Sequence, residues 1–146
     1  MREVRTEIMI GAPAQRVFQI LIAVERYHEW NPLIVSARGK VSPGKKLDIC
    51  IRLRGKPDLP YVVQILRVVP NQEFVWIGRM KIKGILDGTH SFELFTDGAN
   101  RVRVVQREEF RGLLVPLVWR TFLDTRMREG FEAVNRNLKE LAERPT

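Results

Sequence analysis

Apolar residues recur every three or four positions through the last quarter of the chain, and this periodicity constrains the fold more than any other feature. The positions are Trp119, Phe122, Leu123, Met127, Phe131, Val134, Leu138 and Leu141. Such spacing is typical of an amphipathic helix, and we predict one over residues 116–143. At roughly 1.5 Å of rise per residue, it spans about 40 Å. Its opposite face alternates in charge sign, as a solvated helix face does.

Most of the preceding chain has a period of two instead, which is typical of half-buried strands. Strands are predicted over residues 3–10, 33–38, 47–54, 61–69, 74–81, 84–96 and 101–110. After the first strand, Pro13 is well placed as the first residue of a helix and Pro32 follows its end.

Antiparallel strands and a long amphipathic helix each have one apolar face to bury. We therefore predict an α+β fold. A curved antiparallel sheet of six to seven strands wraps around the long C-terminal helix, with one or two short helices after the first strand. A long helix over a curved sheet leaves space between them at one end, and concave apolar spaces of this kind bind small molecules.

Composition excludes several classes of protein. The 146 residues are 45% hydrophobic and 29% charged, which excludes a disordered tail, a fibrous repeat and a disulfide scaffold. We expect a single domain over residues 1–146. Cys50 is the one cysteine and the two histidines lie far apart, so we expect no metal site and no cofactor. The N-terminus lacks a signal-peptide pattern and no apolar run reaches the roughly 18 residues of a membrane span, so we expect a cytoplasmic protein.

The formal net charge of +8 raises nucleic acid, anionic membranes and anionic small molecules as partners. Residues 38–56, here called the basic hairpin, hold most of this excess. Its basic residues are Arg38, Lys40, Lys45, Lys46, Arg52, Arg54 and Lys56, against the single acid Asp48. The segment lacks the interleaved aromatic residues of a nucleic-acid surface. Either the lysines protect a solvated edge hairpin, or the hairpin docks on an anionic membrane or an acidic protein.

Several segments in this order resemble a known superfamily. They are residues 12–18 (APAQRVF), 27–32 (YHEWNP), 87–94 (DGTHSFEL) and 108–113 (EEFRGL). Nearly the whole chain resembles the START-like, or Bet v 1-like, superfamily (SRPBCC), in its polyketide cyclase/dehydrase-like branch. The resemblance implies the helix-grip fold with a cavity between sheet and helix. The superfamily includes lipid carriers, hormone receptors, cyclases, quinone-binding proteins and chaperone cofactors, so function must be argued from the site.

Alternation along three predicted strands places polar and aromatic residues on shared faces, and the resemblance implies that these faces line the cavity. The candidate ligand-binding residues are Trp30, Phe74, Trp76, His90, Phe92, Gln106, Glu108, Trp119 and Phe122. On the C-terminal helix, Met127 and Phe131 join Phe122 as core or cavity floor. The alternative interpretation of Trp30 is a core aromatic residue at the junction of helix and sheet.

His90 and Glu108 are the candidate catalytic residues. Histidine titrates near neutral pH and can act as an acid or a base, and Glu108 on the adjacent strand is placed to orient it. No third residue completes a triad, and the sequence has no serine elbow or Gly-rich phosphate loop. The alternative is a buried histidine whose polar atoms are satisfied by a partner.

Three functions remain open. The leading hypothesis is binding or transport of a small hydrophobic, lipid-like or aromatic ligand in the cavity. The second is a cyclase/aromatase-type enzyme in which His90 and Glu108 move protons. The third is a protein-interaction module that uses the basic hairpin. The sequence leaves the oligomeric state open.

Overall fold

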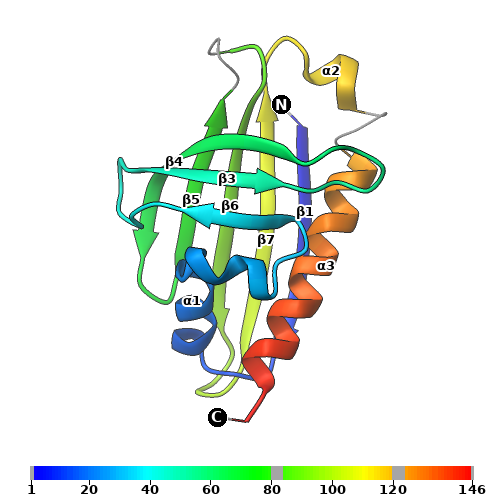
Figure 1. The fold of residues 1–146 in the computed structure, drawn as a ribbon. Helices are drawn as coiled ribbons and strands as arrows, with labels where there is room; N and C mark the ends of the chain where they lie inside the picture. The colour runs from blue at the N-terminus through cyan, green and yellow to red at the C-terminus, as the bar shows by residue number, and fades with distance from the viewer. Residues whose placement is uncertain (1, 80–83, 120–123, 146) are drawn as a thin grey trace.

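A computed structural model describes residues 2–79, 84–119 and 124–145. Figure 1 shows a strongly curved sheet with α3 packed along it. The strands are β1 (Arg2–Ile10), β2 (Ile34–Arg38), β3 (Lys46–Ile51), β4 (Leu59–Val69), β5 (Glu73–Arg79), β6 (Asp87–Thr96) and β7 (Val102–Arg111). The helices are α1 (Ala14–Ile22), the 3₁₀ helix η1 (Val24–Glu29), α2 (Val115–Val118) and α3 (Asp124–Glu143).

The described strands form one antiparallel sheet in the order β1-β7-β6-β5-β4-β3-β2. The first and last strands are therefore neighbours, and β2 lies at the opposite edge. The predicted α+β fold, with a curved antiparallel sheet around a long C-terminal helix, is confirmed. The strand predicted over 84–96 begins later, at Asp87, because Gly84 turns the chain with a φ of 88°.

The described parts of the helix predicted over 116–143 are α2 and α3. Residues 120–123 of that prediction lie outside the described residues. Gly112 turns the chain out of β7 with a φ of 129°, and a Cβ there would lie 2.4 Å from the Ile85 carbonyl oxygen. Pro116 then occupies the first turn of α2, a position where its missing N–H costs nothing.

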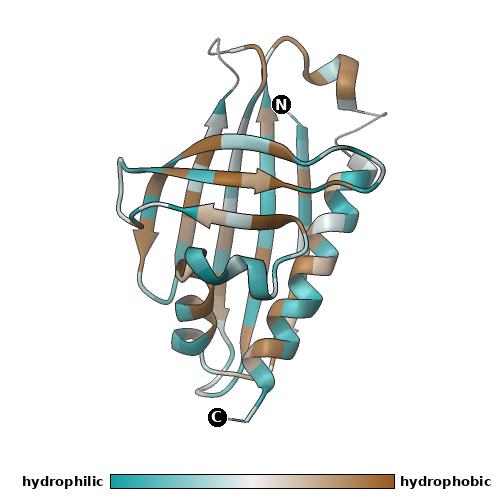
Figure 2. Cartoon of the chain, in the orientation of Figure 1, coloured by the Kyte–Doolittle hydropathy of each residue, from teal (hydrophilic) through white to brown (hydrophobic). Residues whose placement is uncertain are grey.

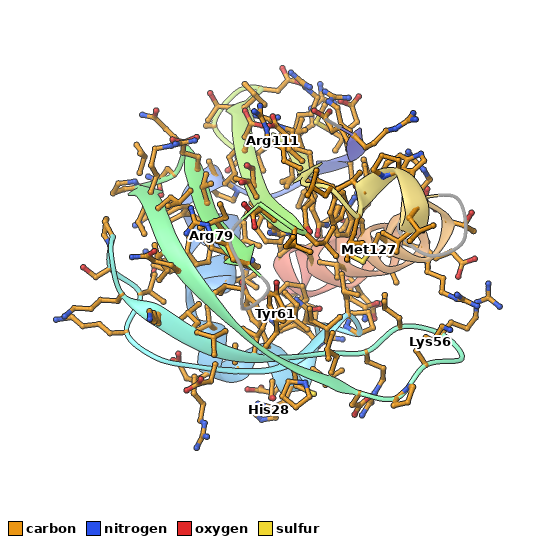
Figure 3. The ribbon with its side chains drawn as sticks, turned by 90° about the horizontal axis from the view of Figure 1, so that it is seen from above. His28, Lys56, Tyr61, Arg79, Arg111 and Met127 are labelled. Carbon is orange, nitrogen blue, oxygen red and sulfur yellow. The ribbon has the colours of Figure 1, made fainter. Side chains whose placement is uncertain are left out.

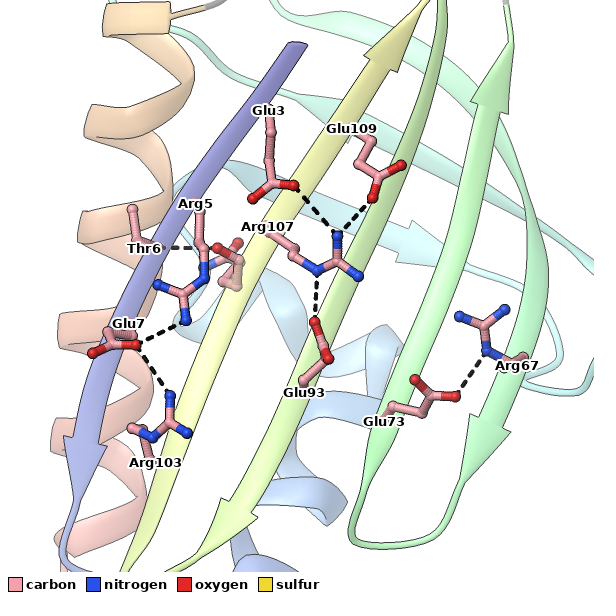
Figure 4. Close-up of polar contacts among 11 residues, drawn as sticks. Glu3, Arg5, Thr6, Glu7, Arg67, Glu73, Glu93, Arg103, Arg107 and Glu109 are labelled. Carbon is pink, nitrogen blue, oxygen red and sulfur yellow. Dashed lines mark hydrogen bonds and ion pairs between the residues drawn. The ribbon is translucent and has the colours of Figure 1, made fainter. Parts of the chain in front are cut away.

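Charged side chains cover the outer face of the sheet (Figure 4). Arg107 on β7 bridges Glu93 at 2.6 Å, Glu109 at 2.7 Å and, more weakly, Glu3 at 3.4 Å. These side chains stay partly open to solvent, and ion pairs on such a surface contribute little free energy each. They do mark the solvent face, and a one-residue slip in register would turn this face into the core.

The inner face of the sheet and the apolar stripe of α3 form the core. Phe131, Val134 and Leu138 of α3 are fully or almost fully buried, and Figure 2 shows apolar residues alternating with polar ones along the strands and α3. Pro13 precedes α1 rather than starting it, with its carbonyl accepting the Val17 N–H at 3.2 Å. Among the described helices, none is long and apolar enough to cross a membrane.

Candidate functional site: a cavity between the sheet and α3

A cavity of about 310 Å³ lies between the sheet and α3. Figure 3 shows the molecule from the end at which the cavity lies, with Tyr61 on the sheet side and Met127 on α3. Most of its lining is aliphatic or aromatic, including Ile49, Ile51, Leu53, Val63, Met127 and Phe131. Leu59 also lines the cavity and is 48% exposed. The cavity therefore opens to solvent where β4 begins.

Three titratable side chains face this apolar lining: Tyr61 from β4, His90 from β6 and Glu108 from β7. His90 and Glu108 occupy directly paired positions of neighbouring strands. A small-molecule site typically has a small number of polar groups in an apolar concavity. The hydrogen bonds and burial of each group decide what it offers a ligand.

Gln106 holds His90, and the network behind it fixes the histidine tautomer. The Gln106 amide nitrogen donates to the Phe131 carbonyl oxygen at 3.2 Å and to Asn135 Oδ1 at 2.8 Å, so its Oε1 is left to accept. His90 Nε2 lies 3.0 Å from that oxygen and therefore carries the proton. Asn135 in turn donates to Thr6 Oγ1 at 2.9 Å. This buried chain of hydrogen bonds joins α3 to β1, β6 and β7.

The expectation that Glu108 orients His90 is wrong, because Gln106 takes that place. His90 Nδ1 has no hydrogen-bond partner among the described residues. The imidazole is 2% exposed and stacks on the Trp76 ring, with ring centroids 4.5 Å apart. Burial lowers the pKa of His90 to about 4, while the bond to Gln106 acts weakly in the opposite direction. At neutral pH this histidine is uncharged.

Burial has the opposite effect on the carboxyl group of Glu108, raising its pKa to about 8, because a low-dielectric site disfavours the charged form. The residue is only partly accessible, and that accessibility is to the cavity that it lines. No hydrogen bond to the Glu108 carboxyl is found in the described part of the chain. At neutral pH the group is mostly a carboxylic acid, which can donate a hydrogen bond.

The predicted site residues separate into groups. Trp76, His90 and Glu108 line the cavity, as do Met127 and Phe131. Three others are at most 1% exposed and pack behind the lining: Phe74, Phe92 and Gln106.

The remaining candidates lie elsewhere. Trp30 lines a separate surface groove of about 770 Å³ beside α1 and the end of α3. Trp119 packs edge-on against Phe110, which does line the cavity, and the Arg2 guanidinium lies 5.7 Å from the centre of its ring. Phe122 lies outside the described residues.

Sequence reasoning missed Tyr61 and the glycines Gly78 and Gly88, which all line the cavity. The alternation of β4 places Tyr61 on the same face as the buried Val63, so a signal existed for it. The glycines gave no such signal, because their role depends on which strands become neighbours.

The basic hairpin (residues 38–56) runs from Arg38, the last residue of β2, through β3 and into the loop that follows, near the β2 edge of the sheet. Two of its arginines form ion pairs, Arg52 with Asp58 at 2.8 Å and Arg54 with Glu129 at 2.9 Å. Part of its positive charge is thus neutralised within the fold. Its use as a docking surface stays a prediction.

A known family matches residues 1–143 of the chain, and it is described as "Polyketide cyclase / dehydrase and lipid transport". The chain belongs to this family. The match spans all the described strands and helices, and this family's fold encloses a ligand-binding cavity. No curated protein matches the chain significantly.

Solved structures resemble this family member over its whole length. An aromatase/cyclase from Streptomyces sp. R1128 is 18% identical with a TM-score of 0.80, covering 98% of this chain and 94% of that one. A START superfamily protein from Mycobacterium smegmatis is 16% identical with a TM-score of 0.75, covering 97% of both chains. A protein from Thermus thermophilus is 18% identical with a TM-score of 0.75, covering 95% of both. At these identities the likeness shows the shared fold alone.

Proposed function

We propose that this protein binds a small, largely apolar ligand in the cavity between the sheet and α3. The observation that carries the proposal is the cavity itself: about 310 Å³, lined mainly by apolar side chains. That volume is at the small end of the range for ligand sites. Burial of apolar ligand surface supplies affinity at about 25 cal/mol per Å², and the few polar groups orient the ligand.

Blocking the cavity tests this proposal. Ile51 lines it, so Ile51→Trp fills the space a ligand needs. Val62→Trp is the matched control, because Val62 is 49% exposed and does not line the cavity. We expect calorimetric titration to show that the bicyclic hydrocarbon tetralin binds the wild type and Val62→Trp alike, and binds Ile51→Trp at least about tenfold more weakly. Absence of binding to the wild type, or equal binding to both variants, contradicts the proposal.

A second candidate function is a cyclase/dehydratase-type enzyme, and the environment of Glu108 favours it. A carboxyl group with a pKa of about 8 is protonated at neutral pH, so it can donate its proton as an acid. Its pKa is also close enough to neutral pH for the group to take a proton back as a base. His90 is less suited to that work, because its low pKa makes it a weak base. The candidate reaction is an intramolecular aldol condensation of a poly-β-ketone chain. It forms a carbon–carbon bond between two carbons of the chain and releases water.

The enzyme hypothesis predicts that Glu108→Gln abolishes turnover of a poly-β-ketone thioester while tetralin still binds. The amide keeps the size of the side chain but cannot transfer a proton at neutral pH. Product formation followed by mass spectrometry is the measurement. Turnover that survives Glu108→Gln shows that Glu108 does not transfer the proton. Turnover that is absent in the wild type leaves ligand binding as the function.

A further inference from the structure

Two glycines face each other beneath the polar part of the cavity. Gly78 on β5 is paired with Gly88 on β6, and both line the cavity. A Cβ on Gly78 would lie 2.5 Å from Cε1 of Tyr61, and a Cβ on Gly88 would lie 2.5 Å from Oε2 of Glu108. Real Cβ atoms do not approach so closely. The missing side chains therefore make the space in which the Tyr61 ring and the Glu108 carboxyl lie.

These two side chains come from strands that are not neighbours, since β5 and β6 lie between β4 and β7. Because the paired glycines have no side chains, the Tyr61 and Glu108 side chains can extend across the two intervening strands. They are close enough to interact electrostatically: burial raises the pKa of Tyr61, and the carboxyl groups of Glu108 and Asp87 raise it further. Neither the Tyr61 hydroxyl nor the Glu108 carboxyl has a hydrogen bond to another group in the described ranges.

Among the residues that the structure describes, the surroundings of Glu108 add no compensating charge. Across the cavity, α3 presents Met127 and Phe131, and β5 presents Trp76. The other titratable groups are His90, which is uncharged at neutral pH, and Asp87, which lies 4.0 Å from Arg79. In the described part of the chain, the cavity lining thus contains two unpaired, uncharged donors, a phenol hydroxyl and a carboxylic acid, beside the neutral His90 and mainly apolar side chains.

We propose that Tyr61 and Glu108 form a subsite for one uncharged acceptor oxygen, and that the ligand is a compact, largely apolar ketone whose carbonyl oxygen accepts a hydrogen bond from each. This proposal rests on the proposed function and names the ligand class for the same cavity. A carbonyl oxygen has two lone pairs and accepts two donors. A hydrocarbon in the same place leaves both donors buried without partners, which is costly. The cavity therefore selects the ketone over the matched hydrocarbon.

The test compares 1-tetralone with tetralin, which differ by one carbonyl oxygen, by calorimetric titration at about pH 6. We expect the wild type to bind the ketone about tenfold more tightly than the hydrocarbon. Tyr61→Phe and Glu108→Leu each remove one donor, so each reduces this preference several-fold. Tetralin binds both variants at least as tightly as the wild type, because each variant removes a donor that tetralin leaves without a partner.

A second arm uses pH. At about pH 9 the Glu108 carboxyl is mostly ionised, and a carboxylate repels the carbonyl oxygen. We expect the ketone preference of the wild type to fall there. Glu108→Gln is the control, since its amide N–H donates at both pH values and keeps the preference constant.

The outcomes separate the two proposals. If tetralin binds and tetralone binds no better, or if Tyr61→Phe and Glu108→Leu leave the preference unchanged, the ketone subsite is wrong while ligand binding stands. If neither compound binds the wild type, both proposals fail. Should Glu108→Leu not fold, Tyr61→Phe and the pH dependence of the wild type decide the question.

Discussion

At the scale of single residues, His90 and Glu108 show how one environment moves two pKa values in opposite directions. They are paired across β6 and β7. Burial penalises the charged form of each, so the pKa of the histidine falls to about 4 and that of the carboxyl rises to about 8. Both side chains are uncharged at neutral pH. The apolar cavity thus tolerates two titratable groups without an ion pair between them.

Glu108 makes folding stability depend on pH. Its pKa rises from a reference value of 4.5 to about 8 on folding, so the folded state holds the proton more strongly. The stabilising contribution is complete below pH 4.5 and is lost as the pH rises to about 8. The loss is at most about 1.4 kcal/mol per pH unit. We expect Glu108→Gln to remove this slope, so that its advantage in unfolding free energy over the wild type grows from pH 4.5 to pH 8.

Denaturant unfolding of both proteins at a series of pH values measures this difference. His90 contributes with the opposite sign: its pKa falls on folding, so its contribution is present above pH 6.5 and is lost as the pH falls to about 4. Both proteins carry His90, so its effect cancels in the comparison. A difference that is independent of pH would show that Glu108 is not desolvated in the folded state.

At the scale of elements, α3 is fixed at its C-terminal end by one side chain from α1. Arg16 Nε donates to the Ala142 carbonyl oxygen at 2.6 Å, and its Nη2 donates to those of Leu141 at 3.3 Å and Arg144 at 3.1 Å. The last carbonyl groups of a helix lack partners within the helix, and a cation there also complements the helix dipole. This contact joins α1 to the helix that closes the cavity.

We expect Arg16→Met to lower the unfolding free energy by about 1–2 kcal/mol, because the carbonyl groups lose charged donors. Hydrogen exchange in the last turn of α3 should quicken. Arg26→Met is the control: Arg26 is exposed and its guanidinium pairs with Glu29, three residues away, so its removal should change stability little. Equal effects of the two substitutions would show that Arg16 does not hold the helix end.

At the scale of the whole molecule, the fold could be predicted because each periodicity matches a buried face. Alternation located the inner faces of β3, β6 and β7, and the spacing of Phe131 and Leu138 located the buried stripe of α3. The site was less predictable, since it depends on contacts between strands distant in sequence. Tyr61 lies within electrostatic reach of Glu108 across a pair of glycines on the two strands between them. His90 is held by Gln106 rather than by the residue opposite it.

The arrangement of the chain ends relative to the cavity has a practical consequence for assays. Figure 1 shows that β1 and α3 both begin at the end of the molecule where the cavity lies, and that α3 finishes at the far end. A tether attached after α3 therefore holds the protein on a sensor surface with the opening directed into the flowing solution. The same tether placed before β1 would put the surface beside the opening and slow the entry of ligand.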